Sequence, residues 1–192
     1  MPKTVCFGEI MLRLSPPGYE RLLQTPALNA TFGGGEANVA VSLAQFGCDS
    51  HYVTRLPDNP LGDAAVRTLR AEGVQTNHIV RGGTRLGIYF AETGASQRPG
   101  TVLYDRSHSA ISELEPGTVP WPDDFTGAAW FHWTGITPAS SASAAGCTRE
   151  AIDAAKAAGC RVSVDLNYRR KLWSEQEAQR VMRPLMPLVD LV

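Results

Sequence analysis

The sequence lacks the features that mark several large classes of protein. Its 192 residues hold 18 Lys and Arg against 19 Asp and Glu, and this net charge of −1 offers no electrostatic basis for binding nucleic acid or an anionic membrane. No apolar run approaches the length that crosses a bilayer. The first residues lead directly into a strand pattern without a signal-peptide segment. These absences predict a cytoplasmic protein with neither a nucleic-acid partner nor a membrane partner.

Residues that commonly bind metals are few and scattered. The four cysteines form neither a CxxC pair nor a zinc-binding spacing, so we expect reduced thiols. His51, His78 and His108 also lack metal-ligand spacing, and we predict no metal-ligating residue in this chain. The remaining histidine, His132, has no paired acid or nucleophile. This pattern favours a core histidine bonded to the backbone over a catalytic one.

What the sequence does contain is an alternation of strand and helix patterns. The predicted core strands cover residues 4–7, 51–54, 128–133, 161–166 and 188–192. The predicted helices cover residues 39–46, 61–71, 149–158 and 175–182. Residues 139–145 are expected to be a Ser- and Ala-rich connection. The alternation predicts an α/β domain in which helices connect the strands of a parallel sheet.

Two strand-like runs interrupt this alternation. Residues 87–92 and 101–106 are joined by a polar stretch, which predicts an antiparallel pair. Together with the irregular segment 12–31, the pair could form a small side sheet. On these strands Tyr89, taken alone, favours a packing role, whereas the guanidinium of Arg106 needs an anionic partner wherever it is covered.

A glycine-rich stretch, Phe-Gly-Gly-Gly-Glu-Ala-Asn-Val-Ala at residues 32–40, precedes the first predicted helix. Glycine lets the backbone approach a ligand closely, and a helix start offers unpaired N–H groups. The Asn38 amide carries a donor and an acceptor, which suits recognition of hydroxyl groups. The stretch is neither a Walker A loop nor a dinucleotide fingerprint. The alternative is that it is only a tight connection.

Polar clusters also follow the predicted strands, where an open α/β sheet binds its ligands. They are Gly8-Glu9, Thr134-Gly135-Ile136 and residues 165–171. In the last of these, Asp165 and Asn167 precede the cations of Arg169-Arg170-Lys171, and this combination suits phosphate oxygens or a substrate carboxylate. The alternative is a solvated loop in which Asp165 caps a helix.

Taken together, these motifs resemble the N-terminal part of the PfkB (ribokinase-like) family of sugar kinases. The family resemblance rests on Gly33-Gly34, Asn38-Val39-Ala40, Gly47 and the Leu61-Gly62-Asp63 turn. Within the family, the sequence is most similar to the 2-keto-3-deoxygluconate kinases. This narrower resemblance rests on Gly8-Glu9, the whole of residues 33–40, Thr134-Gly135-Ile136-Thr137-Pro138 and residues 165–173. The motifs occur in the family's order along the whole chain.

The resemblance implies a doubly wound, mostly parallel sheet with helices on both faces, plus a β-sheet lid from about residues 12–31 and 86–106. It implies phosphorylation of a sugar-acid hydroxyl with ATP and Mg²⁺, and it allows a homodimer through the lid. The implied substrate-binding residues are Gly34, Gly35, Asn38, Tyr89, Tyr104, Arg106, Ile136 and Arg169. The implied cofactor-binding residues are Asn167 and Arg169.

One family motif does not occur in this sequence. The Gly-Ala-Gly-Asp loop, which in the family carries the catalytic base and the anion hole, is absent from residues 1–192. We therefore expect these residues to be the N-terminal portion of a single kinase domain, without the catalytic base and inactive alone. Two alternatives remain: a kinase for a neutral sugar such as fructose or ribose, and an inactive, truncated sugar-binding remnant.

Overall fold

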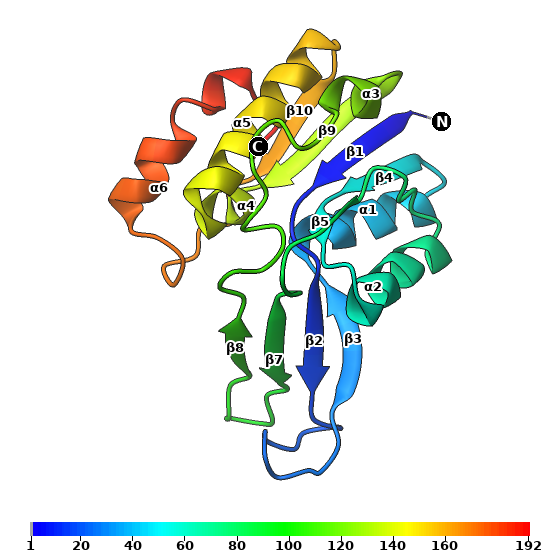
Figure 1. Cartoon of the computed structure of the whole chain (residues 1–192). Coiled ribbons are helices and arrows are strands. Elements are labelled where there is room, and N and C mark those ends of the chain that lie inside the picture. Colours follow the sequence, from blue (N-terminus) through cyan, green and yellow to red (C-terminus); the bar gives the residue numbers. More distant parts are fainter. Residues whose placement is uncertain (1) are drawn as a thin grey trace.

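The computed structural model describes residues 2–192, apart from the side chains of residues 122 and 124. Within this part of the chain, the strands form a four-stranded parallel sheet, a four-stranded mixed sheet and a two-stranded pair (Figure 1). The pair consists of β5 (Arg55–Leu56) and β6 (Val80–Arg81). This architecture confirms the predicted α/β fold with a separate small sheet.

The parallel sheet has the strand order β10-β9-β1-β4. Its strands are β1 (Lys3–Phe7), β4 (Asp49–Val53), β9 (Ala128–Thr134) and β10 (Arg161–Asp165). The register places Val5 on β1 between His51 on β4 and Phe131 on β9. Because neighbouring strands run in the same direction, the residues that follow them gather at one edge of the sheet.

Helices cover both faces of the parallel sheet. They are α1 (Gly35–Gln45), α2 (Pro60–Ala71), α3 (Trp121–Phe125), α4 (Ile136–Ser140), α5 (Ala142–Ala157) and α6 (Glu175–Met182). Val5 and Phe7 belong to a hydrophobic cluster with residues of α3 and α5, whereas Cys6 packs in a second cluster with residues of α1 and α2. Successive side chains of β1 therefore point to opposite, covered faces.

The mixed sheet, called the lid sheet below, projects from one end of the parallel sheet (Figure 1). Its order is β3-β2-β7-β8, with β3 (Asn29–Gly33), β2 (Met11–Ser15), β7 (Ile88–Glu92) and β8 (Thr101–Asp105). β2 runs parallel to β7, and the other two pairs are antiparallel. The predicted antiparallel pair in residues 87–106 is confirmed, and the irregular early segment supplies the other two strands.

Helix α1 buries small side chains and one glutamate against the sheet. Phe46 lies just beyond the helix and is 81% exposed, while the helix buries Glu36, Ala37 and Ala40. The short alanine side chains let α1 pack closely against the sheet. The apolar spacing that predicted this helix therefore located the element correctly, although Phe46 at its end does not join the core.

Two other segments also differ from the prediction. Residues 139–145 are mostly helical, since the Ser141 hydroxyl accepts a hydrogen bond from the Ala144 N–H at 3.0 Å and caps α5. Residues 188–192 form no full strand: the 3₁₀ turn Met186–Leu188 is followed by a single parallel bridge between Ser163 and Leu191. There the Asp190 side chain, rather than a backbone carbonyl, accepts the Val162 N–H at 2.7 Å.

No helix of the described residues has both the length and the apolar character that crossing a membrane requires.

Candidate functional site

Glycines bring the sequence motifs into backbone contact at the carboxyl edge of the parallel sheet. A Cβ on Gly34 would overlap the Glu9 carbonyl oxygen, and a Cβ on Gly135 would overlap that of Leu166. The Gly135 N–H also donates to the Asp165 carbonyl at 2.9 Å. The residues after β1, β9 and β10 and the start of α1 therefore form one continuous surface, as expected for a ligand site of an open α/β sheet.

The loop after β10 faces the first turn of α1. A Cβ on Gly35 would lie 3.6 Å from Thr134 Cγ2 and 3.7 Å from Asn167 Nδ2, so this position has ordinary space beside it. Asn167 has a left-handed backbone conformation, with φ of 41°, and Asp165 holds it through hydrogen bonds of 2.9 and 3.2 Å. Asn167 Oδ1 is buried without a hydrogen-bond partner in the described structure, so it is an available acceptor.

A buried carboxyl group, Glu36, lies beneath this surface. Its Oε1 accepts hydrogen bonds from Thr134 Oγ1 at 2.8 Å and from Thr137 Oγ1 at 2.9 Å. A side chain on Gly8 would overlap the carboxyl group. Burial raises the pKa of Glu36, and the two threonine hydroxyls oppose this rise. Sequence reasoning missed this residue because a glutamate at a helix start is usually solvated; its place within the glycine motif was the only available signal.

A second buried carboxyl group, Glu9, forms an ion pair with Arg106. The side chains of Glu9 and Arg106 are only 4% and 10% exposed. Glu9 Oε1 also accepts a hydrogen bond from Ser109 Oγ at 2.7 Å. Burial raises the pKa of Glu9, while the Arg106 charge opposes that rise. The anionic partner that a covered Arg106 requires is thus supplied by the chain itself.

Aromatic side chains form a row on the lid sheet. The strand register aligns Tyr89 with Arg13 on β2 and with Tyr104 on β8, and the two tyrosine rings lie 5.9 Å apart. A Cβ on Gly33 would lie 2.7 Å from the Tyr89 hydroxyl oxygen, so the row reaches the glycine stretch. Burial raises the pKa of Tyr89, and nearby Arg13 opposes the rise. Sequence reasoning missed Arg13, which the alternation of β2 could have identified.

A cavity of about 690 Å³ lies between the lid sheet and the loop after β10. Its lining residues are Val102, Leu103, Tyr104, Arg106, Ser107, Ile136, Arg169, Arg170, Lys171 and Leu172. Within the described residues, no ion pair involves Arg169, Arg170 or Lys171. The cavity is therefore cationic, and it is suited to a ligand that carries negative charge.

The structure brings some of the predicted site residues together and leaves others apart. Tyr104, Arg106, Ile136 and Arg169 line the cavity. The others lie outside its lining: Gly34, Gly35, Asn38, Tyr89 and Asn167. Two links connect the groups, since Tyr89 lies beside Tyr104 and Asn167 precedes Arg169 by two residues. The Asn38 side chain is exposed on the first turns of α1.

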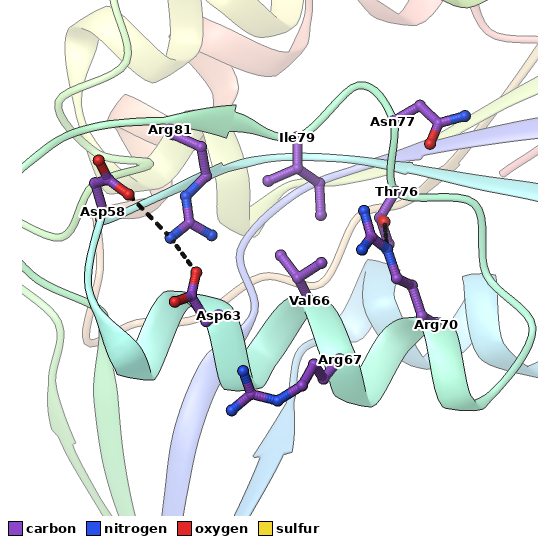
Figure 2. Close-up of a pocket in the computed structure, with 9 residues that line it drawn as sticks. All are labelled: Asp58, Asp63, Val66, Arg67, Arg70, Thr76, Asn77, Ile79 and Arg81. Atoms are coloured by element: carbon purple, nitrogen blue, oxygen red, sulfur yellow. Dashed lines mark hydrogen bonds and ion pairs between the residues drawn. The ribbon is translucent and has the colours of Figure 1, made fainter.

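A different cavity, of about 600 Å³, lies along α2 (Figure 2). Its charged groups largely bind one another. Arg81 Nη2 lies 2.7 Å from Asp63 and 3.5 Å from Asp58, and Arg70 Nε donates to Thr76 Oγ1 at 2.7 Å (Figure 2). Neither the glycine stretch (residues 32–40) nor the cation run (Arg169-Arg170-Lys171) contributes to this cavity. The cationic cavity beneath the lid sheet is therefore the candidate site.

The predicted role of His132 requires a correction. His132 Nδ1 lies 3.0 Å from the Ser163 hydroxyl, so its partner is a side chain of the neighbouring strand and not the backbone. Burial lowers the pKa of His132 and favours the neutral ring. Among the described residues, no cluster of three or more His, Cys, Asp or Glu side chains could hold a metal ion.

Comparison with known proteins identifies a family that matches this chain and several relatives of it. The model of the pfkB family of carbohydrate kinases matches residues 1–192. A 2-dehydro-3-deoxygalactonokinase from Haloferax volcanii is 39% identical over 188 residues, which are 98% of this chain and 59% of that protein.

Two solved structures are also similar. The crystal structure of a 2-dehydro-3-deoxygluconokinase from Thermotoga maritima has a TM-score of 0.98 and 54% identity, and the match covers all of this chain and 59% of that one. A fructokinase from Xylella fastidiosa, solved with bound ATP, has a TM-score of 0.81 and 28% identity, with 98% of this chain and 60% of that chain covered. The chain thus spans about three fifths of the length of the relatives it matches.

Proposed function

The chain belongs to the pfkB family of carbohydrate kinases, and we propose that the whole protein phosphorylates a hydroxyl group of 2-keto-3-deoxygluconate, also called 2-dehydro-3-deoxygluconate, with ATP as the donor. The proposal extends to this chain the substrate that names the Thermotoga maritima relative. A sugar acid needs hydrogen-bond partners for its hydroxyls and a cationic partner for its carboxylate. The candidate site contains both kinds of group.

The cationic cavity is the observation that carries this proposal. Arg169, Arg170 and Lys171 face it without an acidic partner among the described residues. Arg106 lies in the same wall, beneath the lid sheet. A guanidinium fork matches a carboxylate or phosphate in a bidentate manner, so Arg169 suits the acid group of the sugar or a phosphate.

The remaining residues have complementary roles in the proposal. Gly34 and Gly35 let the start of α1 approach the sugar, and Asn38 offers an amide to its hydroxyls. Tyr89 and Tyr104 place two hydroxyl-bearing rings on the lid sheet. Ile136 supplies an apolar contact at the cavity wall. Closure of the lid sheet over this surface would exclude water from the sugar.

ATP, when bound, supplies the phosphoryl group. The loop after β10 fits its phosphates because Arg169, Arg170 and Lys171 are cations that the described chain does not neutralise. Asn167, with its buried acceptor, is a further cofactor-binding candidate. Mg²⁺ belongs to the proposal through the general chemistry of phosphoryl transfer, and the described residues include no acidic cluster that would bind it without ATP.

The catalytic base is assigned to a part of the whole protein outside residues 1–192. Phosphoryl transfer needs a group that accepts the proton of the attacking hydroxyl. The family's Gly-Ala-Gly-Asp loop does not occur in these residues. Reading the coding sequence beyond Val192 separates the proposal from the alternative of a truncated remnant: an open frame that reaches this motif supports a kinase, and a stop codon supports the remnant.

A direct test compares substrates on the purified whole protein. ADP release should be fastest with 2-keto-3-deoxygluconate and much slower with fructose, at equal ATP and Mg²⁺. The Arg169→Gln variant should lose activity mainly on the sugar acid, if this arginine binds the carboxylate. An equal or faster rate on fructose would replace the proposal with a neutral-sugar kinase. An equal loss on both substrates would place Arg169 at the phosphates.

A homodimer through the lid sheet is a further part of the proposal. β8 forms an edge of that sheet, and its Leu103 is 52% exposed. An apolar edge of this kind favours contact with a second copy. Light scattering of the whole protein, compared with a Leu103→Lys variant, tests this arrangement.

A cytoplasmic location is also proposed, in keeping with the four cysteines, all of which are unpaired thiols.

A further inference from the structure

Glu9 occupies the place where the chain passes between the two large sheets. It lies in the connection that leads from β1 into β2. Its carbonyl oxygen contacts Gly34, in the connection from β3 into α1, where a Cβ would overlap that oxygen. Its carboxylate approaches Gly87, just before β7, where a Cβ would lie 2.5 Å from Oε1. Its carboxylate also pairs with Arg106, just after β8.

Each of the four connections between the lid sheet and the rest of the chain therefore includes Glu9 or a residue that contacts it. The β1–β2 connection contains Glu9 itself, and Gly34, Gly87 and Arg106 lie in the other three. The carboxylate is held from another side by Ser109 Oγ, which donates to Oε1 at 2.7 Å. Packing and hydrogen bonding thus restrict Glu9 to one position at the base of the lid sheet.

The Arg106 guanidinium is restrained in turn by this carboxylate. Arg106 is 10% exposed, and a guanidinium at that depth needs a countercharge, which Glu9 provides. The guanidinium also lies 5.9 Å from the centre of the Tyr104 ring. Arg106 nevertheless remains part of the cavity wall. Arg106 is therefore both the partner of a buried carboxylate and a residue of the cavity lining.

We propose that Glu9 is a positioning residue: it holds the Arg106 guanidinium at the cavity wall and thereby contributes to selectivity for an anionic sugar over a neutral one. This inference rests on the proposed function of the same site. A binding group held in place by a second residue loses less freedom when it meets its ligand. Without the Glu9 charge, the buried cation would be left uncompensated and would move from this position.

The test uses the whole protein and measures kcat and KM for 2-keto-3-deoxygluconate and for fructose. The Glu9→Gln variant retains the shape of the side chain and removes its charge. We expect the KM for the sugar acid to rise about tenfold, the effect of losing one charge-assisted contact, while the KM for fructose changes little. Selectivity for the acid should fall in proportion.

Glu92→Gln is a matched control. Glu92 also pairs with an arginine, since its Oε2 lies 3.6 Å from Arg98 Nη1, but both residues belong to the lid sheet and its outer loop. This variant removes a Glu–Arg pair without affecting the base of the lid sheet, so selectivity should remain as in the wild type. Ser109→Ala is a second probe, because it removes one hydrogen bond to Glu9 and retains both charges. It should shift selectivity in the same direction as Glu9→Gln, by a smaller factor.

Each other outcome overturns the inference. If Glu9→Gln raises both KM values equally, Glu9 is a structural residue of the lid sheet. If it lowers the KM for the sugar acid, Glu9 competes with the substrate for Arg106. If Glu9→Gln does not fold, unchanged selectivity in Ser109→Ala counts against the inference. Failure of the proposed function is distinct, because the wild-type protein would then show no preference for the sugar acid.

Discussion

Oε1 of Glu36 lies 2.8 Å from Oγ1 of Thr134, and this contact joins the first turn of α1 to the end of β9. The contact is buried, and Thr137 donates to the same oxygen. Residues 98 positions apart in the sequence thus hold the glycine stretch against the start of α4, where Ile136 lies. The surface assigned to the sugar depends on this internal carboxyl group.

Removal of the Glu36 carboxyl group should destabilise the protein. Glu36→Ala leaves two threonine hydroxyls without their acceptor and opens a cavity, so the free energy of unfolding should fall by about 2–5 kcal/mol. Glu36→Gln keeps an acceptor oxygen and should cost less. Urea unfolding of the whole protein measures both values. Equal stability of Glu36→Ala and the wild type would contradict a structural role for this group.

The same residue predicts a pH dependence of stability. Burial raises the pKa of Glu36 in the folded state, whereas the unfolded chain titrates near the ordinary value of about 4.3. Between these two pKa values the folded state binds more protons, so Glu36 contributes less stability as the pH rises through this window. The unfolding free energy of the wild type relative to Glu36→Gln should therefore decrease from about pH 4 upward and then level off. A difference that increases with pH would contradict the raised pKa.

Gly34 and Gly35 should respond differently to the same substitution. Gly34→Ala places a Cβ against the Glu9 carbonyl and 3.2 Å from Ile10 Cα, so the backbone must shift, at a cost of about 1–3 kcal/mol. Gly34→Val should abolish sugar binding. Gly35→Ala meets only ordinary contacts, and stability should change by less than about 1 kcal/mol. Thermal unfolding measures the stability of each variant, and calorimetry with the sugar acid measures its affinity. Unchanged affinity in both Gly34 variants would show that the glycine stretch is only a structural turn.

The cation run should determine affinity for anions. Arg170→Gln and Lys171→Gln each remove an exposed charge from the cavity wall, so folding should be nearly unchanged. The KM for an anionic ligand should rise several-fold, and the effect should weaken at high salt, which screens exposed charges. Kinetics at low and high ionic strength measure this dependence. Lys156→Gln, which removes a cation outside the cavity, is the control.

Residues 1–192 expressed alone should show no kinase activity, since they lack the family's catalytic loop. They should also tend to aggregate. β10 is an edge strand, and within residues 2–192 the bridge between Ser163 and Leu191 alone extends the sheet beyond it. Leu191 and Val192 are exposed. An ADP-release assay and light scattering test both expectations. Substrate-dependent ADP release by a monomeric fragment would show that the chemistry does not depend on the missing loop.

The sequence by itself determined the order of the elements and the location of the motifs. The apolar spacing around residues 4–7 and 161–166 and the glycines after the helices are local signals, which were sufficient to predict the α/β alternation. The antiparallel strand pair in residues 87–106 was also predicted from a local signal, namely two strand-like runs joined by a polar stretch. Gly135 and Asn167 follow predicted strands, and an open α/β sheet binds ligands beyond the carboxyl ends of its strands, so both were expected at the site.

Only the tertiary structure decided which charged groups are buried and what they contact. Glu9 and Arg106 are 97 positions apart, and the sequence contains no signal that pairs them. In the sequence, Glu36 is indistinguishable from a solvated glutamate at a helix start. In the folded protein, the packing of α1 buries it against the hydroxyls of Thr134 and Thr137. Long-range contacts of this kind depend on how whole elements pack, and a local pattern of residues contains no information about the partner that lies across the core.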